Sequence, residues 1–131
     1  MSPTTVIVDA SAIVEVLRAT ELGGRVAARL RGENLAAPAH LDAEVLSALG
    51  RHVRGGWAAP DAVERALEQL RRLPIERLPL PPLLQRAWRL REAIALRDGL
   101  YVAGTEVLGG VLLTLDRRLA RAAAVPVDCP T

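Results

Sequence analysis

Four acidic residues of this sequence have a type and spacing that suit metal-dependent chemistry: Asp9, Glu44, Asp98 and Asp116. Asp9 directly follows one short apolar run, residues 5–8, and Asp116 directly follows another, residues 111–115. Two carboxylates about 4 Å apart repel by about 4 kcal/mol at an effective dielectric near 20. A cluster of such groups must therefore hold protons or bind a cation. Because every ligand would be an oxygen atom, we expect Mg²⁺, with Mn²⁺ as the other suitable ion.

A divalent cation among these acids suggests hydrolysis of a phosphodiester by metal-activated water. Such an ion activates the water and stabilises the leaving oxygen of an in-line displacement at phosphorus. We expect Asp9, Asp98 and Asp116 to bind the metal directly. Glu44 would ligate the metal or orient its water, so all four acids are the expected catalytic residues. The sequence has no lysine, and we expect the metal to assist the leaving group.

Helix capping is the simpler interpretation of each acid taken alone. Aspartate is a favoured N-cap residue, and Asp9, Asp98 and Asp116 each precede an expected helix. Glu44 alone would be explained as a partly buried acid paired with an arginine. Capping does not explain four acids that converge on one cleft with no obvious basic partner among them.

The elements that must position these acids alternate between strands and helices. Short apolar or alternating runs predict strands at residues 5–8, 35–37, 75–80 and 111–115, with a terminal edge strand at Val127. Helical periodicity with glycine stops and proline starts predicts helices at residues 10–18, 21–31, 40–53, 60–72, 83–95, 98–108 and 117–124. The alternation predicts an α/β fold, a three-layer α/β/α domain around a central, mostly parallel sheet of four to five short strands.

This topology brings the acids to one edge of the sheet. In open parallel sheets, ligands bind beyond the carboxyl ends of the strands. Asp9 and Asp116 follow strands, and Asp98 begins the helix that leads into the fourth strand. Glu44 lies inside the apolar stripe of the helix after the second strand, where an unpaired acid is costly.

Length and composition predict one domain, residues 1–131, with one core. No apolar run approaches the roughly 20 residues of a membrane span, and the first residues do not resemble a secretory signal. The one cysteine, Cys129, has no partner. We therefore expect a cytoplasmic protein with no membrane interaction.

Charge and aromatic content limit how the chain would bind a nucleic acid. All 17 basic residues are arginines, which grip phosphate bidentately, but the net charge is only +2. Trp57, Trp88 and Tyr101 are the only aromatic residues of the Phe, Trp and Tyr types, which argues against a platform for stacked bases. Arginine and metal would therefore hold any RNA by its backbone.

Several neighbours of the acids are weaker candidates. Ser11 and Thr114 could orient a carboxylate or a metal-bound water, although a helix-start hydrogen bond and an ordinary strand position explain them as well. Arg97 and Arg117 flank two of the acids and could contact substrate phosphate, although solvated or ion-paired arginines are an equal alternative. His40 and His52 lack zinc-like spacing, and no chemistry is assigned to them.

Three segments resemble the PIN-domain ribonucleases, in particular the VapC-type toxins of bacterial toxin–antitoxin pairs. The segments are VIVDASAIVEVL (6–17), LDAEVLSAL (41–49) and RDGLYVAGTEVLGGVLLTLDRRLARAA (97–123). The last segment is the most specific. By position, the four acids match the acidic quartet of that family, and Ser11 and Thr114 match positions that often support it.

The resemblance implies a Mg²⁺-dependent endoribonuclease that acts on structured RNA such as transfer RNA. It also implies a homodimer and a small antitoxin from the same operon, which blocks the site and binds DNA, so that DNA is contacted only indirectly. The sequence departs from the family at Gly99, where alanine is usual, and at Gly104 and Thr105, which replace a more apolar pair. These residues weaken the helix behind Asp98 but remove no acid.

Three other kinds of protein share some of these features. A phosphoacceptor receiver domain relies on a lysine that this chain lacks, and a dinucleotide-binding domain needs a glycine fingerprint where the chain has DASAIV. A catalytically silent PIN-like binding module that docks a protein partner remains the alternative, because the intact quartet argues against it only moderately.

Overall fold

The computed structural model describes residues 3–56 and 58–130, so that Trp57 lies outside the described residues. Five strands form one sheet: β1 (Thr5–Val8), β2 (Asn34–Pro38), β3 (Ile75–Leu78), β4 (Val111–Leu113) and β5 (Val127–Asp128). Their order is β3-β2-β1-β4-β5, and every neighbouring pair is parallel. The expected parallel sheet is confirmed, with β1 at its centre and the predicted terminal strand at its edge.

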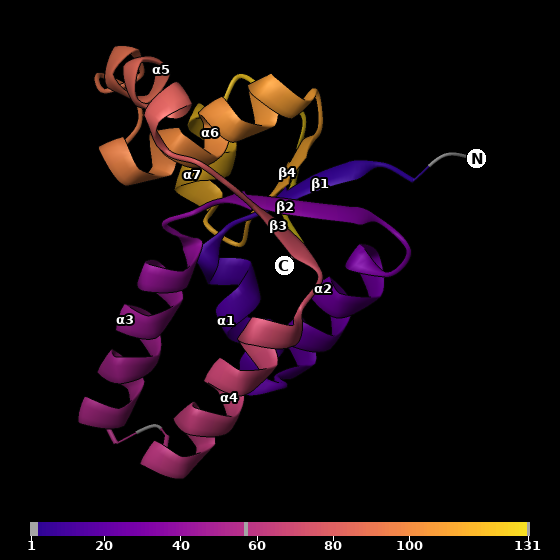
Figure 1. The fold of residues 1–131 in the computed structure, drawn as a ribbon, viewed down its shortest axis with the longest axis vertical. Helices are drawn as coiled ribbons and strands as arrows, with labels where there is room; N and C mark the ends of the chain where they lie inside the picture. The colour runs from indigo at the N-terminus through magenta and orange to yellow at the C-terminus, as the bar shows by residue number, and fades with distance from the viewer. Residues whose placement is uncertain (1–2, 57, 131) are drawn as a thin grey trace.

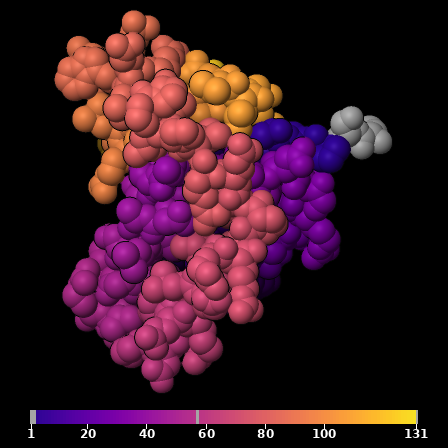
Figure 2. Space-filling view, in the orientation of Figure 1, coloured from indigo at the N-terminus to yellow at the C-terminus, as the bar shows by residue number. Residues whose placement is uncertain are grey.

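Helices cover both faces of this sheet and complete the three expected layers (Figure 1). On one side lie α1 (Ala10–Arg18), α2 (Glu21–Leu30), α3 (Leu41–Arg54) and α4 (Pro60–Arg72). On the other side lie α5 (Leu84–Arg89), preceded by the 3₁₀ turn η1 (Pro81–Leu83), with α6 (Leu96–Leu108) and α7 (Arg117–Ala122). Figure 2 shows α3 and α4 as a lobe that projects away from the sheet.

The buried strands explain why the central elements were predicted correctly. Val6, Ile7 and Val8 of β1 are buried, as are Leu112 and Leu113 of β4. Strands covered on both faces are apolar along their whole length rather than alternating. The apolar runs therefore indicated strands between two helical layers.

An ion pair between a strand and a helix fixes the start of α3. The guanidinium of Arg77 on β3 donates to both carboxylate oxygens of Asp42, over 3.1 Å from Nε and 2.8 Å from Nη2. Such bidentate pairs hold geometry better than single contacts. This pair fixes the first turn of α3, and with it Glu44, at the carboxyl edge of the sheet.

The helix predicted at 83–95 was too long. The α-helix ends at Arg89, and the chain turns through residues 90–94 so that Ile94 becomes buried, 5% exposed. The next helix consequently begins at Leu96 rather than at Asp98. Packing of one apolar side chain overrides the local helical preference of this segment.

The strands predicted at 111–115 and 75–80 were also too long, since β4 ends at Leu113 and β3 at Leu78. After β4 the backbone bonds to side chains: the Leu115 N–H donates to Ser11 Oγ and the Asp116 N–H to Thr114 Oγ1, both over 3.0 Å. Asp116 therefore does not directly follow the strand. Among the described residues, no helix has the length and apolar character needed to cross a membrane.

Candidate active site

The four acids predicted from the sequence line one cavity of about 400 Å³. They come from four separate places: the end of β1, the first turn of α3, the first turn of α6 and the loop before α7. We call this the acidic cavity. The topology thus brings together residues that are far apart in the sequence, at the carboxyl edge of β1 and β4 as expected.

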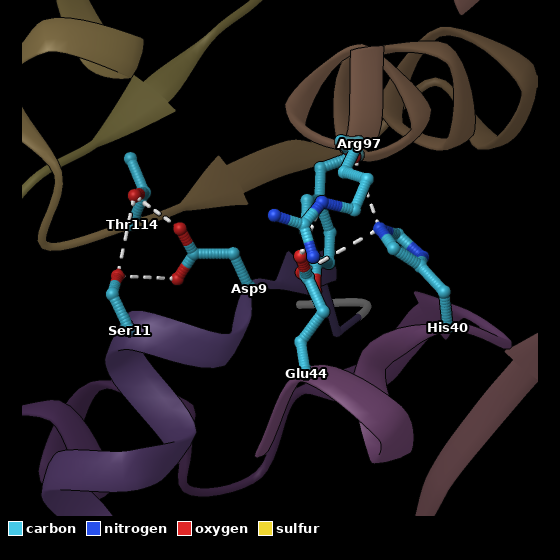
Figure 3. A network of polar contacts seen from close by, with 7 residues as sticks. Asp9, Ser11, His40, Glu44, Arg97 and Thr114 are labelled. Carbon is cyan, nitrogen blue, oxygen red and sulfur yellow. Dashed lines mark hydrogen bonds and ion pairs between the residues drawn. The ribbon is translucent and has the colours of Figure 1, made fainter. Parts of the chain in front are cut away.

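Asp9 forms one wall of the acidic cavity and is only 4% exposed. Its Oδ1 accepts hydrogen bonds from Ser11 Oγ (2.7 Å) and from the Ala12 N–H (3.1 Å), and its Oδ2 accepts one from Thr114 Oγ1. Figure 3 shows these three side chains as one cluster. Burial raises the pKa of Asp9, while these hydrogen bonds act in the opposite direction. Asp9 is therefore both the N-cap of α1 and a wall of the cavity.

Glu44 faces Asp9 across the cavity and has its own set of partners (Figure 3). The Tyr101 hydroxyl donates to Glu44 Oε1 over 2.7 Å, and His40 Nε2 lies 3.5 Å from the same oxygen. Arg97 Nε lies 3.7 Å from Oε2. The expectation of no basic partner among the acids was therefore wrong at Glu44. The Arg97 side chain is 80% exposed, however, so solvent screens this ion pair.

Asp98 is half-buried in the first turn of α6, where it does not cap the helix. Burial raises the pKa of Asp98, and the neighbouring charges of Asp116 and Glu44 raise it further. From the sequence, repulsion between crowded carboxylates was expected. At Asp98, loss of solvent raises the pKa more than this repulsion does.

Asp116 is the exposed member of the four. Its Oδ1 accepts hydrogen bonds from the Arg118 N–H (2.9 Å) and the Leu119 N–H (3.2 Å), which makes it the N-cap of α7. Capping was the simpler interpretation of the aspartates, and it holds at Asp9 and Asp116 but not at Asp98. It does not compete with the cavity, because both capping residues also line it.

Tyr101 and His40, to which the sequence analysis assigned no role in the site, hold Glu44 in place. Tyr101 is 1% exposed and its ring lies 4.6 Å from that of His40, while His40 Nε2 lies 3.0 Å from the Arg97 carbonyl oxygen. Helical spacing was the available signal, because Tyr101 follows Asp98 by three residues and His40 precedes Glu44 by four. Burial raises the pKa of Tyr101 above its usual range, as does the hydrogen bond to Glu44. Tyr101 therefore remains a protonated donor.

The two flanking arginines named from the sequence differ in position. Arg97 contacts Glu44 at the cavity. Arg117 is exposed and is absent from the residues found to line the cavity in the described chain, whereas Arg51 and His52 line it.

The donor set of the acidic cavity suits a hard divalent cation. Within residues 3–56 and 58–130, no three or more His, Cys, Asp or Glu side chains are already grouped closely enough to hold an ion. The cavity nevertheless offers carboxylate oxygens from four elements, the ligands that Mg²⁺ and Mn²⁺ prefer. The charges that raise the pKa of Asp98 are those that a cation would offset.

Comparisons of sequence and of structure with known proteins point to one family. A family model described as "PIN domain" matches residues 6–125. The chain is 50% identical over 121 residues to Ribonuclease VapC3 of Mycobacterium tuberculosis H37Rv, covering 92% of this chain and 88% of the relative. It is 42% identical over 116 residues to Ribonuclease VapC12 of that strain, covering 88% and 90%. A chain in the crystal structure of VapBC2 from Rickettsia felis, bound to a DNA fragment from their promoter, shares the fold (TM-score 0.69, 10% identity, coverage 95% and 98%).

Proposed function

Because the chain belongs to the PIN-domain family, and within it to the VapC proteins, we propose that it is a toxin that cleaves RNA as a Mg²⁺-dependent endoribonuclease, with Mn²⁺ as a substitute ion. The observation that carries the proposal is the acidic cavity, which four carboxylates from four elements line together. Residues 1–131 form a single PIN-like domain in this proposal, and the protein acts in the cytoplasm.

Asp9, Asp98 and Asp116 are the residues that would hold the cation, with Glu44 beside them. When bound, the ion supplies positive charge that activates water and stabilises the leaving oxygen of the RNA. Asp9 is presented in a fixed orientation, because Ser11, Ala12 and Thr114 all donate to its carboxylate. A carboxylate has about four lone-pair sites, so Asp9 keeps capacity for a further ligand.

Glu44 is the residue that orients the attacking water and accepts its proton. Tyr101 occupies Oε1, whereas Oε2 faces only the solvent-screened guanidinium of Arg97 among its described ion-pair partners. Oε2 is thus the oxygen that takes the proton. Displacing Arg97 from Glu44 would free both groups, Oε2 for the water and the guanidinium for substrate phosphate.

Removing one carboxylate charge tests this assignment. We expect Asp9→Asn and Asp98→Asn to abolish cleavage of cellular RNA while leaving the fold intact. Asp61→Asn is the matched control, because Asp61 is an exposed acid in the first turn of α4 and should keep full activity. The measurement is mapping of RNA 5′ ends after brief induction. Wild-type cleavage that persists in excess EDTA would contradict the metal requirement.

We further propose a protein antitoxin that neutralises this chain, with DNA bound by the antitoxin only. Support comes from the fold that this chain shares with a chain of VapBC2, whose crystal structure holds a DNA fragment from the promoter. A homodimer and a structured substrate such as transfer RNA belong to the same proposal. Co-expression with the neighbouring open reading frame should yield a complex and restore growth. A chain that is harmless when expressed alone and cleaves no RNA would instead support the silent docking module.

A further inference from the structure

A second cavity, also of about 400 Å³, adjoins the acidic cavity. Asp98 and Asp116 line both, so these two acids stand on the wall between them. The rest of the second cavity is formed by the turn after α5 and by α7, and two arginines, Arg91 and Arg118, line it. We call it the arginine cavity.

Arg91 is held in position by its neighbours. Its guanidinium carbon lies 4.4 Å from the centre of the Trp88 ring, and its Nη1 donates to the Trp88 carbonyl oxygen over 3.1 Å. A cation over an indole face is attracted by the ring. The remaining donors of the guanidinium are thus presented in a fixed orientation. Glu92, whose Oε1 lies 3.7 Å from Arg91 Nε, is 88% exposed and its charge is screened by solvent.

Arg118 provides the second positive charge from the first turn of α7. Its backbone N–H donates to Asp116 over 2.9 Å, which fixes the start of its side chain beside the shared acid. Its guanidinium forms no ion pair with any side chain in the part of the chain that the structure describes. Arg118 is therefore available to an anionic ligand.

We propose that the arginine cavity binds a backbone phosphate of the RNA strand next to the phosphate that is cleaved. This inference rests on the proposed nuclease function and assigns Arg91 and Arg118 to the substrate. A strand whose scissile phosphate lies at the shared acids must pass its flanking phosphates over a surface that four carboxylates make negative. Two guanidinium groups on the far side of Asp98 and Asp116 offset that repulsion. Arginine suits the task because its planar fork binds phosphate oxygens in pairs.

The test measures binding of a fluorescein-labelled, single-stranded RNA 12-mer in the presence of Mg²⁺. The host protein is Asp9→Asn, because Asp9 lines the acidic cavity only and its replacement leaves the arginine cavity unchanged. We expect Arg118→Ala and Arg91→Ala each to weaken binding about tenfold at low salt. Each substitution should also make the negative slope of log association constant against log salt concentration less steep by about 0.7, the value for one lost phosphate contact to a single strand.

Arg121→Ala is the matched control, since Arg121 is an exposed arginine on α7 that is not among the residues found to line the arginine cavity. Its affinity and salt slope should equal those of the host protein. In the otherwise native protein, Arg118→Ala should raise KM for RNA and leave kcat largely unchanged. Cleavage and RNA affinity that are both unaltered in the Arg91 and Arg118 variants would overturn this inference alone. A protein that neither binds nor cleaves RNA would overturn the nuclease function as well.

Discussion

At the scale of single residues, Tyr101 shows how a core residue becomes part of a site. The ring is buried against His40, and only its hydroxyl reaches the cavity, where it donates to Glu44. A buried hydroxyl that donates to a carboxylate fixes one rotamer of that acid and leaves its other oxygen for chemistry. We therefore regard Tyr101 as a positioning residue for Glu44.

Replacing Tyr101 by phenylalanine removes this hydrogen bond and keeps the ring. We expect a loss of about 1.5–3 kcal/mol in the free energy of unfolding, the usual value for a hydrogen bond to a charged group. We also expect kcat for RNA cleavage to fall about tenfold with KM little changed, because Glu44 loses its fixed orientation. Urea denaturation and steady-state kinetics measure the two effects. Equal kcat values for the variant and the wild type would show that Tyr101 serves the core only.

Among the elements, α6 depends on two glycines in different ways. A Cβ built on Gly99 would lie 3.2 Å from Ala87 Cα and 3.3 Å from the Ala87 carbonyl oxygen, so this glycine lets α5 and α6 approach closely. A Cβ on Gly104 would lie 3.4 Å from Leu78 Cδ1 and 3.5 Å from Pro38 Cγ, which are ordinary contacts. The helix is continuous through both. The close approach to Ala87 gives Gly99 a packing role that the sequence comparison with the family did not indicate.

The two glycines should therefore respond differently to alanine. Gly104→Ala should increase the free energy of unfolding by about 0.5–1 kcal/mol, because alanine costs less backbone entropy in a helix. Gly99→Ala should be at least about 1 kcal/mol less stable than Gly104→Ala, because its methyl group meets backbone that cannot rotate away. Chemical denaturation of both variants measures the difference. Equal gains from both substitutions would contradict the packing role of Gly99.

The sequence predicted elements well where the signal lay within the element itself. The strand at Thr5–Val8 and the helices at Ala10–Arg18 and Pro60–Arg72 have the predicted bounds. The predicted bounds were wrong where residues distant in the sequence determine the end of an element. Ile94 is buried by tertiary packing, and the Leu115 N–H bonds to the side chain of Ser11 instead of to a neighbouring strand.

In the site, too, local features were predicted better than contacts between distant residues. The four carboxylates could be identified by residue type and by their places relative to the expected strands and helices, and one cavity brings all four together. Whether they hold a metal stays a prediction. The contact of Tyr101 with Glu44 was missed because helical spacing alone does not distinguish a residue of the site from an ordinary core residue before the helices pack.

For the whole molecule, the acidic cavity is a source of instability that depends on pH. Burial and neighbouring charges raise the pKa of Asp98 in the folded chain, so the folded state binds more protons than the unfolded state just above the ordinary aspartate pKa of about 3.9. By linkage, the free energy of unfolding must then fall as the pH rises from the ordinary aspartate pKa to the pKa of Asp98 in the folded chain. The loss persists at higher pH.

We accordingly expect the free energy of unfolding of the metal-free protein to fall across this window relative to Asp98→Asn. Millimolar Mg²⁺ should reverse the difference at neutral pH, because a ligand that binds only the folded state stabilises it. Urea titrations at several pH values, in EDTA and in Mg²⁺, measure both effects. Parallel curves for the two proteins in EDTA would show that Asp98 titrates normally.

The position of β1 in the sheet has a consequence for synthesis on the ribosome. This strand precedes the other four strands in the chain. One of its sides nevertheless pairs with β4, and Asp9 receives a hydrogen bond from Thr114, 105 residues further on. The cavity therefore cannot assemble while the C-terminal segment is still inside the exit tunnel. A nascent chain that still lacks β4 and Thr114 therefore has no complete acidic cavity, because one strand beside β1 and one donor to Asp9 are both missing.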